Sequence, residues 1–318
     1  MRSPEKIKQI VESWSALRYG MFIHYGMSTF VRAEMPDGRE PSETYAPTDL
    51  NVDSWIQTAA EAGMKYAVLT AKHVSGHCLW NSRHTDYSVA TSADPTDVVA
   101  AFTGACKKHG VLPGLYYCSW DNHHRFGSKT PNTENCSWHD CFTTPRYWDF
   151  QMSQLEELCT GYGPLCEIWI DIPKILPRAI RQEMYDSIAR WQPDAVIVMN
   201  HGISDGSRFD INYAWPTDVI AIERFLPSSS EGFVPLREIE GTQYYLGGEV
   251  CDPIGREWFF VDGDTPRSDE ELLGMYLLST ARGCNLLLDV PPDRNGRIPV
   301  SFQESLLRLK ANLDRLGL

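Results

Sequence analysis

Short apolar segments alternate with longer segments of helical period along almost the whole chain, and this alternation restricts the fold more than any other feature. Strands that are buried on both faces read as short apolar runs, whereas amphipathic helices show apolar residues every three or four positions. This order is typical of βα units around a parallel sheet. With 318 residues, the chain has room for two average domains or for one barrel of eight such units, which needs ~250 residues.

Eight segments are candidate strands. They are apolar or aromatic runs at 19–24, 66–70, 115–118, 168–171, 196–199, 219–222, 258–260 and 286–288. Helical periodicity fills most of the intervals, at 52–62, from Pro95 to before Gly110, and at 147–160, 178–191 and 302–313. No Gly-x-Gly-x-x-Gly turn follows the first candidate strand, so a doubly wound dinucleotide-binding sheet lacks support. We therefore expect one α/β domain over residues 1–318, a (β/α)8 barrel.

Charge and composition exclude several kinds of partner. Lysine plus arginine number 29 against 42 aspartate plus glutamate, a net charge of −13, and a field of this sign repels nucleic acid and anionic lipid. No apolar run reaches the ~18 residues of a membrane helix, and the N-terminus has no apolar signal segment. We expect a cytoplasmic protein, or a periplasmic or secreted one if a leader has been removed. The nine cysteines form no Cys-x-x-Cys pair, which favours reduced thiols. The oligomeric state stays open.

Polar and aromatic residues gather where the candidate strands end. In a (β/α)8 barrel, these ends form the rim that carries the active site. The residues at these ends are His24-Tyr25, Lys72-His73, Tyr117 with Trp120 beyond it, Asp171, Asn200-His201, Glu223, and Trp258 near the seventh strand. Aromatic rings stack on the apolar face of a sugar, and histidine and asparagine bind its hydroxyls. This rim therefore predicts a pocket for a neutral polyhydroxyl ligand.

Two carboxylates at strand ends indicate the chemistry. Glycoside hydrolysis commonly needs one carboxylate as nucleophile or base and one carboxylic acid that protonates the departing oxygen. Asp171 ends an otherwise apolar strand, and Glu223 ends a second one in the same manner. Either residue could instead cap a helix or form an ion pair at the rim, Glu223 with the neighbouring Arg224. The residues alone therefore indicate a carbohydrate-processing barrel and leave both roles open.

The histidines raise the alternative of a catalytic metal. His73 and His77 are four residues apart, and His123-His124 follow the third candidate strand. A barrel metal site usually takes ligands from several strands, and the strand assignment places His73 and His77 in a loop rather than one helical turn apart. We therefore expect no metal ion, and we expect His123-His124 to belong to a loop over the pocket.

Several motifs resemble those of glycoside hydrolase family 29, the α-L-fucosidases. Tyr19-Gly-Met-Phe-Ile-His-Tyr-Gly26 is similar to the first-strand signature, and Ile168-Trp-Ile-Asp171 to the fourth. Further matches in the family's order are residues 62–73, 78–82, 85–89, 114–117 and 285–296. The resemblance implies a retaining exo-glycosidase that acts on an oligosaccharide or glycoside without a metal or organic cofactor. We expect no β-sandwich domain after the barrel, although such a domain often follows it in the family.

The resemblance also implies roles for individual residues. Asp171 matches the family's nucleophile, which forms a covalent glycosyl-enzyme that water hydrolyses. The acid/base position is poorly fixed in this family. Glu223 is the first candidate and Glu249 is the second. If Glu249 is not the acid/base, we expect it to bind the substrate. The residues expected to bind the sugar are His24, Tyr25, His73, Trp80, Tyr117, Trp120, Trp169 and Trp258.

One block departs from the family pattern. The family usually has Lys-His-His-Asp-Gly-Phe where this chain has Lys72-His-Val-Ser-Gly-His77, so Val74 replaces a sugar-binding histidine. His77 either takes over that role or is a core histidine. Two alternatives to an α-L-fucosidase stay open: a family member that acts on another sugar, and a barrel that binds carbohydrate without catalysis.

Overall fold

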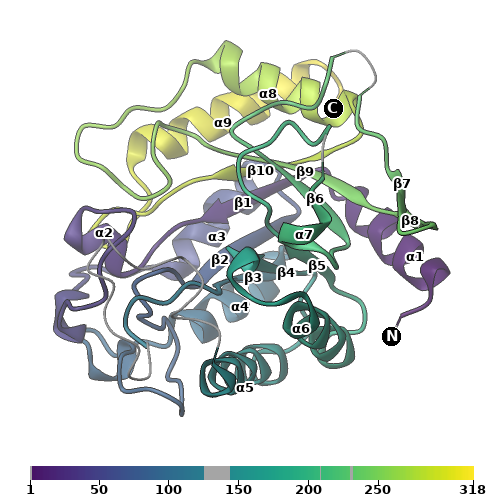
Figure 1. The fold of residues 1–318 in the computed structure, drawn as a ribbon. Coiled ribbons are helices and arrows are strands. Elements are labelled where there is room, and N and C mark those ends of the chain that lie inside the picture. The colour runs from purple at the N-terminus through teal and green to yellow at the C-terminus, as the bar shows by residue number, and fades with distance from the viewer. Residues whose placement is uncertain (1, 125–143, 208, 230–231) are drawn as a thin grey trace.

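The computed structural model describes residues 2–124, 144–207, 209–229 and 232–318. Within these ranges, eight parallel strands close into a barrel in the order β1-β10-β9-β6-β5-β4-β3-β2 (Figure 1). The strands are β1 (Tyr19–Ile23), β2 (Tyr66–Lys72), β3 (Leu112–Cys118), β4 (Glu167–Asp171), β5 (Val196–Met199), β6 (Val219–Glu223), β9 (Gly247–Pro253) and β10 (Asn285–Asp289). The (β/α)8 barrel predicted from the sequence is confirmed.

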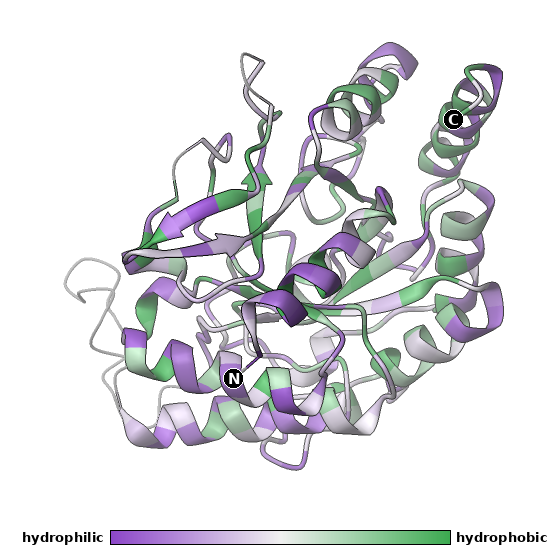
Figure 2. Cartoon of the chain, turned by 90° about the vertical axis from the view of Figure 1, so that its right-hand side faces the viewer, coloured by the Kyte–Doolittle hydropathy of each residue, from purple (hydrophilic) through white to green (hydrophobic). Residues whose placement is uncertain are grey.

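Helices surround the barrel and follow most of its strands. The long ones are α1 (Pro4–Ser15), α3 (Val52–Glu61), α4 (Val98–His109), α5 (Pro145–Gly161), α6 (Arg178–Trp191), α8 (Asp269–Ala281) and α9 (Val300–Arg315). Short helices occur at α2 (Met27–Val31) and α7 (Ile211–Ala214), with 3-10 turns at η1 (Ser42–Thr44), η2 (Val89–Thr91) and η3 (Pro173–Ile175). These helices carry both hydrophobic and hydrophilic residues, as amphipathic packing on a barrel requires (Figure 2). No helix in the described ranges combines the length and hydropathy of a membrane span.

Local sequence signals set the ends of several helices. The Asp97 side chain accepts a hydrogen bond from the backbone N–H of Ala100 and begins α4, and Gly110, in the left-handed conformation, ends it. Ser268 and Glu271 form a reciprocal capping box at the start of α8. The helices expected at 52–62 and 178–191 are confirmed, and the one opened by Pro95 starts at Val98, after the Asp97 cap.

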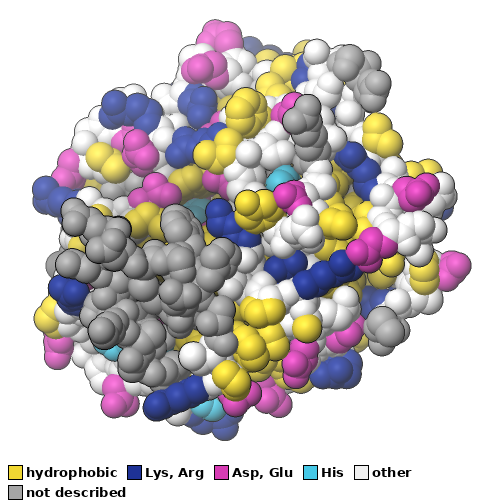
Figure 3. All heavy atoms as spheres, in the orientation of Figure 1, with side chains coloured by type: hydrophobic (Ala, Val, Ile, Leu, Met, Phe, Trp, Pro, Cys, Tyr) yellow, Lys and Arg dark blue, Asp and Glu magenta, His cyan; other side chains and the backbone are white. Residues whose placement is uncertain are grey.

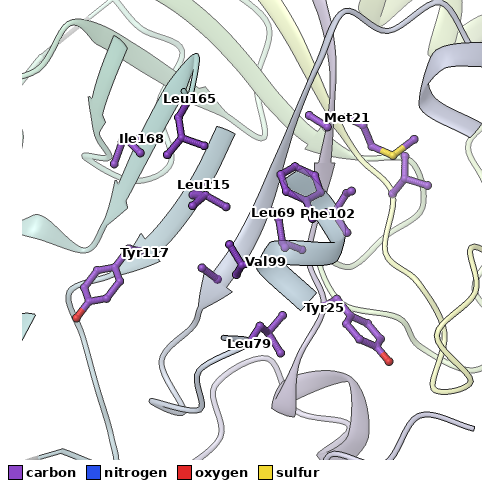
Figure 4. Close-up of a cluster of buried hydrophobic side chains, with 14 of the residues drawn as sticks. Met21, Tyr25, Leu69, Leu79, Val99, Phe102, Leu115, Tyr117, Leu165 and Ile168 are labelled. Atoms are coloured by element: carbon purple, nitrogen blue, oxygen red, sulfur yellow. The ribbon is translucent and has the colours of Figure 1, made fainter. Parts of the chain in front are cut away.

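Side chains alternate along each strand between the barrel interior and the layer beneath the helices. In β4, Trp169 packs with the interior cluster, whereas Ile168 and Ile170 belong to the outer core. Figure 4 shows part of this outer core, where Leu115 and Tyr117 of β3 lie with helix residues such as Val99 and Phe102 of α4. A residue at a strand end therefore reaches a cavity inside the barrel only if its side chain is one of those that point into the barrel.

The seventh barrel strand differs from the prediction. It is β9, and the aromatic run at 258–260 lies in the segment that follows it. The start of β9 has two glycines because its surroundings leave no room for side chains. A Cβ on Gly247 would lie 2.9 Å from the Trp14 ring, and one on Gly248 would lie 2.6 Å from Cys284 Sγ. Packing here overrides strand propensity, which favours aromatic residues over glycine.

An antiparallel hairpin stands between β6 and β9. It consists of β7 (Leu236–Ile239) and β8 (Thr242–Tyr245), and no helix occurs in the described residues between the two barrel strands. Ile239 packs with Ile220 and Leu246 in a separate small core. At the opposite end of the chain, α1 places Trp14 in the interior cluster, where it closes the N-terminal end of the barrel. The carboxyl ends of the strands thus remain as the open end.

Candidate active site

A cavity of about 220 Å³ opens at the carboxyl ends of the strands. Residues from every barrel strand except β10, or from the segments that follow these strands, line it. They are Phe22, His24, Glu34, Met35, His73, Tyr116, Trp169, Asp171, Ile172, Asn200, Gly202, Ile203, Glu223, Cys251 and Trp258. The place of this cavity is the one where (β/α)8 enzymes carry their active sites.

Asp171 and Glu223 meet in this cavity through one shared hydrogen-bond donor. Asn200 Nδ2 donates to Asp171 Oδ1 at 2.8 Å and to Glu223 Oε2 at 3.0 Å. Because both oxygens bond to the same nitrogen, the distance between Asp171 Oδ1 and Glu223 Oε2 cannot exceed the sum of these two hydrogen-bond lengths. That bound lies near the ~5–5.5 Å between the carboxyl groups of retaining glycosidases and below the ~6.5–9.5 Å of inverting ones.

The two carboxyl groups have different environments. Burial, together with the charge of Asp171, raises the pKa of Glu223 to about 7. Asp171 accepts a second hydrogen bond, from the Tyr116 hydroxyl at 2.7 Å. Two neighbouring carboxyl groups whose environments differ in this way are typical of a general acid beside a nucleophile.

The chain turns sharply immediately after each carboxylate. Ile172 has a φ of 49° and Arg224 a φ of 61°, in the left-handed region, which costs non-glycine residues on the order of 1–3 kcal/mol. Contacts of the Arg224 side chain offset this cost, since Nη1 donates to the carbonyl of Arg256 at 2.8 Å and the guanidinium lies 4.7 Å from the Trp258 ring centroid. Strained backbone of this kind concentrates at functional sites.

Two neutral histidines supply hydrogen-bonding groups. Burial lowers the pKa of both His24 and His73 to about 3. Asp289 Oδ1 accepts the backbone N–H of His24 at 3.2 Å and lies 2.8 Å from its Nδ1. We therefore assign the proton to Nδ1, which leaves the Nε2 lone pair for a ligand. His73 Nδ1 has no partner among the described residues, although it is buried.

Aromatic rings form an apolar surface in the same cavity. Trp169 and Tyr116 stack with centroids 5.9 Å apart and an interplanar angle of 20°, and Tyr116 stacks in turn on His73 at 5.8 Å. Trp258 lies 5.2 Å from the His24 ring. Apolar planes beside fixed hydrogen-bonding groups are suited to a sugar ring, which has apolar faces and a hydroxyl edge.

Six of the eleven residues predicted for the site line the cavity together, and five do not. The six are His24, His73, Asp171, Trp169, Glu223 and Trp258. Tyr117 is one of the five: its hydroxyl donates to Gln154 at 2.9 Å in the outer core. In the β3–β4 register, Tyr116 pairs with Trp169 and Tyr117 with Ile170. Tyr116, and not the predicted Tyr117, therefore lies in the wall of the cavity.

Three other aromatic residues expected to bind the sugar lie outside the cavity lining. Tyr25 is fully buried with its ring 5.0 Å from Trp55. Trp80 is buried and donates to Glu157 at 3.0 Å. Trp120 Nε1 donates to Asn122 Oδ1 at 2.7 Å.

Glu249, the second candidate for the acid/base, lies inside the barrel rather than in the cavity lining. Its carboxylate accepts hydrogen bonds from the Tyr66 hydroxyl at 2.6 Å and from Trp169 Nε1 at 3.0 Å. Burial raises the pKa of both Glu249 and Glu167, and the charge of Glu249 adds to the rise for Glu167. Glu249 therefore fixes the Trp169 ring, and Glu223 has the geometry of an acid/base.

His77 and His123 are held by hydrogen bonds within the protein. His77 Nε2 lies 2.9 Å from Ser92 Oγ, and its ring stacks on Tyr45 at 5.4 Å, so it is a core histidine and does not replace the histidine missing at Val74. His123 Nδ1 donates to the carbonyl of Gly38 at 2.7 Å. The described residues contain no group of three His, Cys, Asp or Glu side chains arranged to hold a metal ion. We predicted a loop over the pocket that begins at His123-His124. The part of the chain at 125–143 lies outside the described residues.

Comparisons with known proteins identify the family of this chain. A family model described as "Alpha-L-fucosidase" matches residues 39–317. "Alpha-L-fucosidase 1" of Arabidopsis thaliana is 31% identical over 300 residues, which cover 90% of this chain and 56% of that protein. "Putative alpha-L-fucosidase 1" of Oryza sativa is 29% identical and covers 92% and 56%. The crystal structure of a putative alpha-L-fucosidase from Bacteroides thetaiotaomicron superposes with a TM-score of 0.80 at 28% identity, over 95% of this chain and 67% of that one. The chain thus spans just over half the length of the first two relatives.

Proposed function

We propose that this chain, which belongs to the α-L-fucosidase family, glycoside hydrolase family 29, hydrolyses terminal α-L-fucosides with retention of configuration. The observation that carries the proposal is the pair of carboxyl groups bridged by Asn200 in the rim cavity. At about 220 Å³, the cavity is smaller than the ~300–1,000 Å³ typical of pockets for drug-sized ligands. This size suits a single terminal sugar. The names of the relatives support fucose as that sugar.

In the first step, Asp171 attacks the anomeric carbon while protonated Glu223 transfers its proton to the glycosidic oxygen. The carbon–oxygen bond to the leaving group breaks, and a bond from Asp171 to the sugar forms. The Tyr116 hydroxyl and the Asn200 amide hold the attacking carboxylate in place. In the second step, Glu223, now ionised, takes a proton from water, which attacks the same carbon and releases Asp171.

Recognition of the sugar falls to the neutral groups of the cavity. His24 Nε2 and His73 Nδ1 are available to hydroxyls because neither atom has a partner among the described residues. Trp169 and Trp258 offer apolar surface to the ring. A sugar that leaves His24 or His73 unpaired should bind less well, since an unsatisfied buried polar group costs roughly 1–3 kcal/mol.

A panel of 4-nitrophenyl glycosides tests the proposal. We expect the α-L-fucoside to have the highest kcat/KM, above the β-D-galactoside and the α-L-arabinoside, as measured by nitrophenol release. Turnover of another glycoside with no turnover of the fucoside would make the protein a family member for a different sugar. Tight binding of fucose by calorimetry with no turnover of any glycoside would make it a carbohydrate-binding barrel.

The pH profile of the reaction follows from Glu223. Its pKa of about 7 means that the proton needed by the leaving group is lost as the pH rises, so kcat/KM for an alkyl or oligosaccharide fucoside should fall above pH 7. α-L-Fucosyl fluoride needs no proton on its leaving group and serves as the control substrate. Its kcat/KM should stay level across the same range. An identical decline for both substrates would assign the titration to a group other than the general acid.

A further inference from the structure

Two exposed apolar side chains line the cavity and come from segments on opposite sides of the barrel. Met35 is 50% exposed and Ile203 is 67% exposed, and both line the cavity. Met35 lies on the segment after β1, and Ile203 on the segment after β5. Three strands separate β1 from β5 in either direction around the closed barrel, so these segments leave the rim from opposite sides. We refer to Met35 and Ile203 as the rim pair.

Ile203 is also fixed beside the proposed general acid. It forms a parallel β-bridge with Glu223, which places the two backbones next to each other. The oxygen that receives the proton must lie within hydrogen-bond reach of the Glu223 carboxyl, at ~2.6–3.2 Å. The group attached to that oxygen therefore leaves the cavity alongside Ile203 and toward the gap between the rim pair.

The chemistry of the rim limits what this group can be. Large apolar side chains exposed around a cavity offer contact area to a ligand with an apolar surface. In the face shown in Figure 3, hydrophobic side chains reach the surface near its middle, close to histidine. Glu34 and Asp171 line the cavity, and the protein carries a net charge of −13, so the site disfavours an anionic leaving group.

We propose that the rim pair forms a subsite for the leaving group, which takes a neutral group with a flat apolar face, either a pyranose ring or an aryl ring. This subsite rests on the proposed hydrolase function and adds to it the selection of the group attached to the sugar. The sugar itself is held deeper, by His24, His73 and Trp169, so the rim pair affects discrimination between leaving groups and not between terminal sugars.

Two substrates with the same sugar separate these effects. The leaving group of 4-nitrophenyl α-L-fucoside is a flat aryl ring, whereas that of α-L-fucosyl fluoride is one atom, which is too small to touch the rim pair. We expect Ile203→Ser and Met35→Ser each to lower kcat/KM for the aryl fucoside by about ten-fold, as the loss of an apolar contact to a substrate does. For the fluoride, both variants should stay within about two-fold of the wild type, since no contact is lost there.

Leu236→Ser is the matched control. Leu236 is 57% exposed on β7 and lies outside the cavity lining, so the same kind of substitution there should leave both substrates unchanged. Equal losses on the aryl fucoside and the fluoride in a rim-pair variant, or no loss on either, would overturn the proposal. A ten-fold loss on the aryl fucoside in the Leu236 control would overturn it as well.

If the proposed hydrolase function is wrong, the wild-type protein will turn over neither the aryl fucoside nor the fluoride. This outcome differs from every outcome that concerns the rim pair. The rim pair is then tested by calorimetry with the Asp171→Ala protein. We expect 4-nitrophenyl α-L-fucoside to bind more tightly than free L-fucose. Adding Ile203→Ser should lower the ratio of these two affinities by about ten-fold. An affinity ratio that does not respond to Ile203→Ser would overturn the subsite even for a protein that only binds sugar.

Discussion

Replacing Asp171 by alanine should lower kcat/KM for 4-nitrophenyl α-L-fucoside by about 10³-fold or more, because the covalent route is lost. The residue stands at the end of β4 in a cavity rather than in the packed core, so the fold should survive, as circular dichroism and thermal unfolding would show. Added azide should restore turnover by entering the space of the missing carboxylate. Because azide attacks from that face, the product should be the fucosyl azide of inverted configuration.

Asp37→Ala is the control for this substitution. Asp37 lies on the segment that follows β1, outside the cavity lining, and its ion pair with Arg39 at 3.7 Å is exposed. Turnover by this variant should match that of the wild type. Near-wild-type activity of Asp171→Ala, or loss of wild-type activity on treatment with a chelator, would contradict the role of Asp171.

Replacing Glu223 by alanine should give a loss that depends on the leaving group. For an oligosaccharide fucoside, which leaves poorly without a proton, we expect a fall in kcat/KM of about 10²–10⁴-fold. For 4-nitrophenyl α-L-fucoside the fall should be much smaller, since nitrophenolate departs unprotonated. Azide should again accelerate turnover, but here it attacks the glycosyl-enzyme, so the fucosyl azide should retain the configuration of the substrate. Opposite azide products from the two variants would separate the nucleophile from the acid/base.

Glu249→Ala distinguishes the two candidates for the acid/base. Glu249 accepts the Trp169 indole N–H inside the barrel, so its loss should lower thermal stability and affect all fucosides alike. A leaving-group dependence and azide rescue in Glu249→Ala, with neither in Glu223→Ala, would contradict the assignment.

The barrel and the two carboxylates of the candidate site could be predicted from the sequence because both depend on strand periodicity. Parallel strands buried on two faces give unbroken apolar runs, and a polar residue at the end of such a run stands out. Asp171 and Glu223 stand out in this way, and the structure places both in the cavity. Asn200 also follows a predicted strand, but its hydrogen bonds to both carboxyl groups depend on three neighbouring strands. No pattern within one segment of the sequence indicates them.

Other features depend on packing that the sequence does not display. The run Leu115-Tyr-Tyr-Cys118 has tyrosine on both faces, so its pattern cannot show which of Tyr116 and Tyr117 points inward; the register with β4 decides it. The glycines of β9 reflect the close approach of Trp14 and Cys284, which come from distant parts of the chain. Met35 reaches the cavity from an irregular segment after β1, where no periodicity applies.

In the proposed mechanism, Asp171 becomes covalently bonded to the sugar, and trapping of this intermediate is the sharpest test of that mechanism. A 2-deoxy-2-fluoro-fucosyl fluoride reacts in the first step because fluoride leaves readily, and the fluorine at C2 slows the second step, so the glycosyl-enzyme accumulates. Mass spectrometry of the digested protein should find one fluorofucosyl group, attached to Asp171. An adduct on another residue would exclude Asp171 as the nucleophile. The absence of any adduct in a protein that hydrolyses fucosides with inversion would exclude the covalent mechanism.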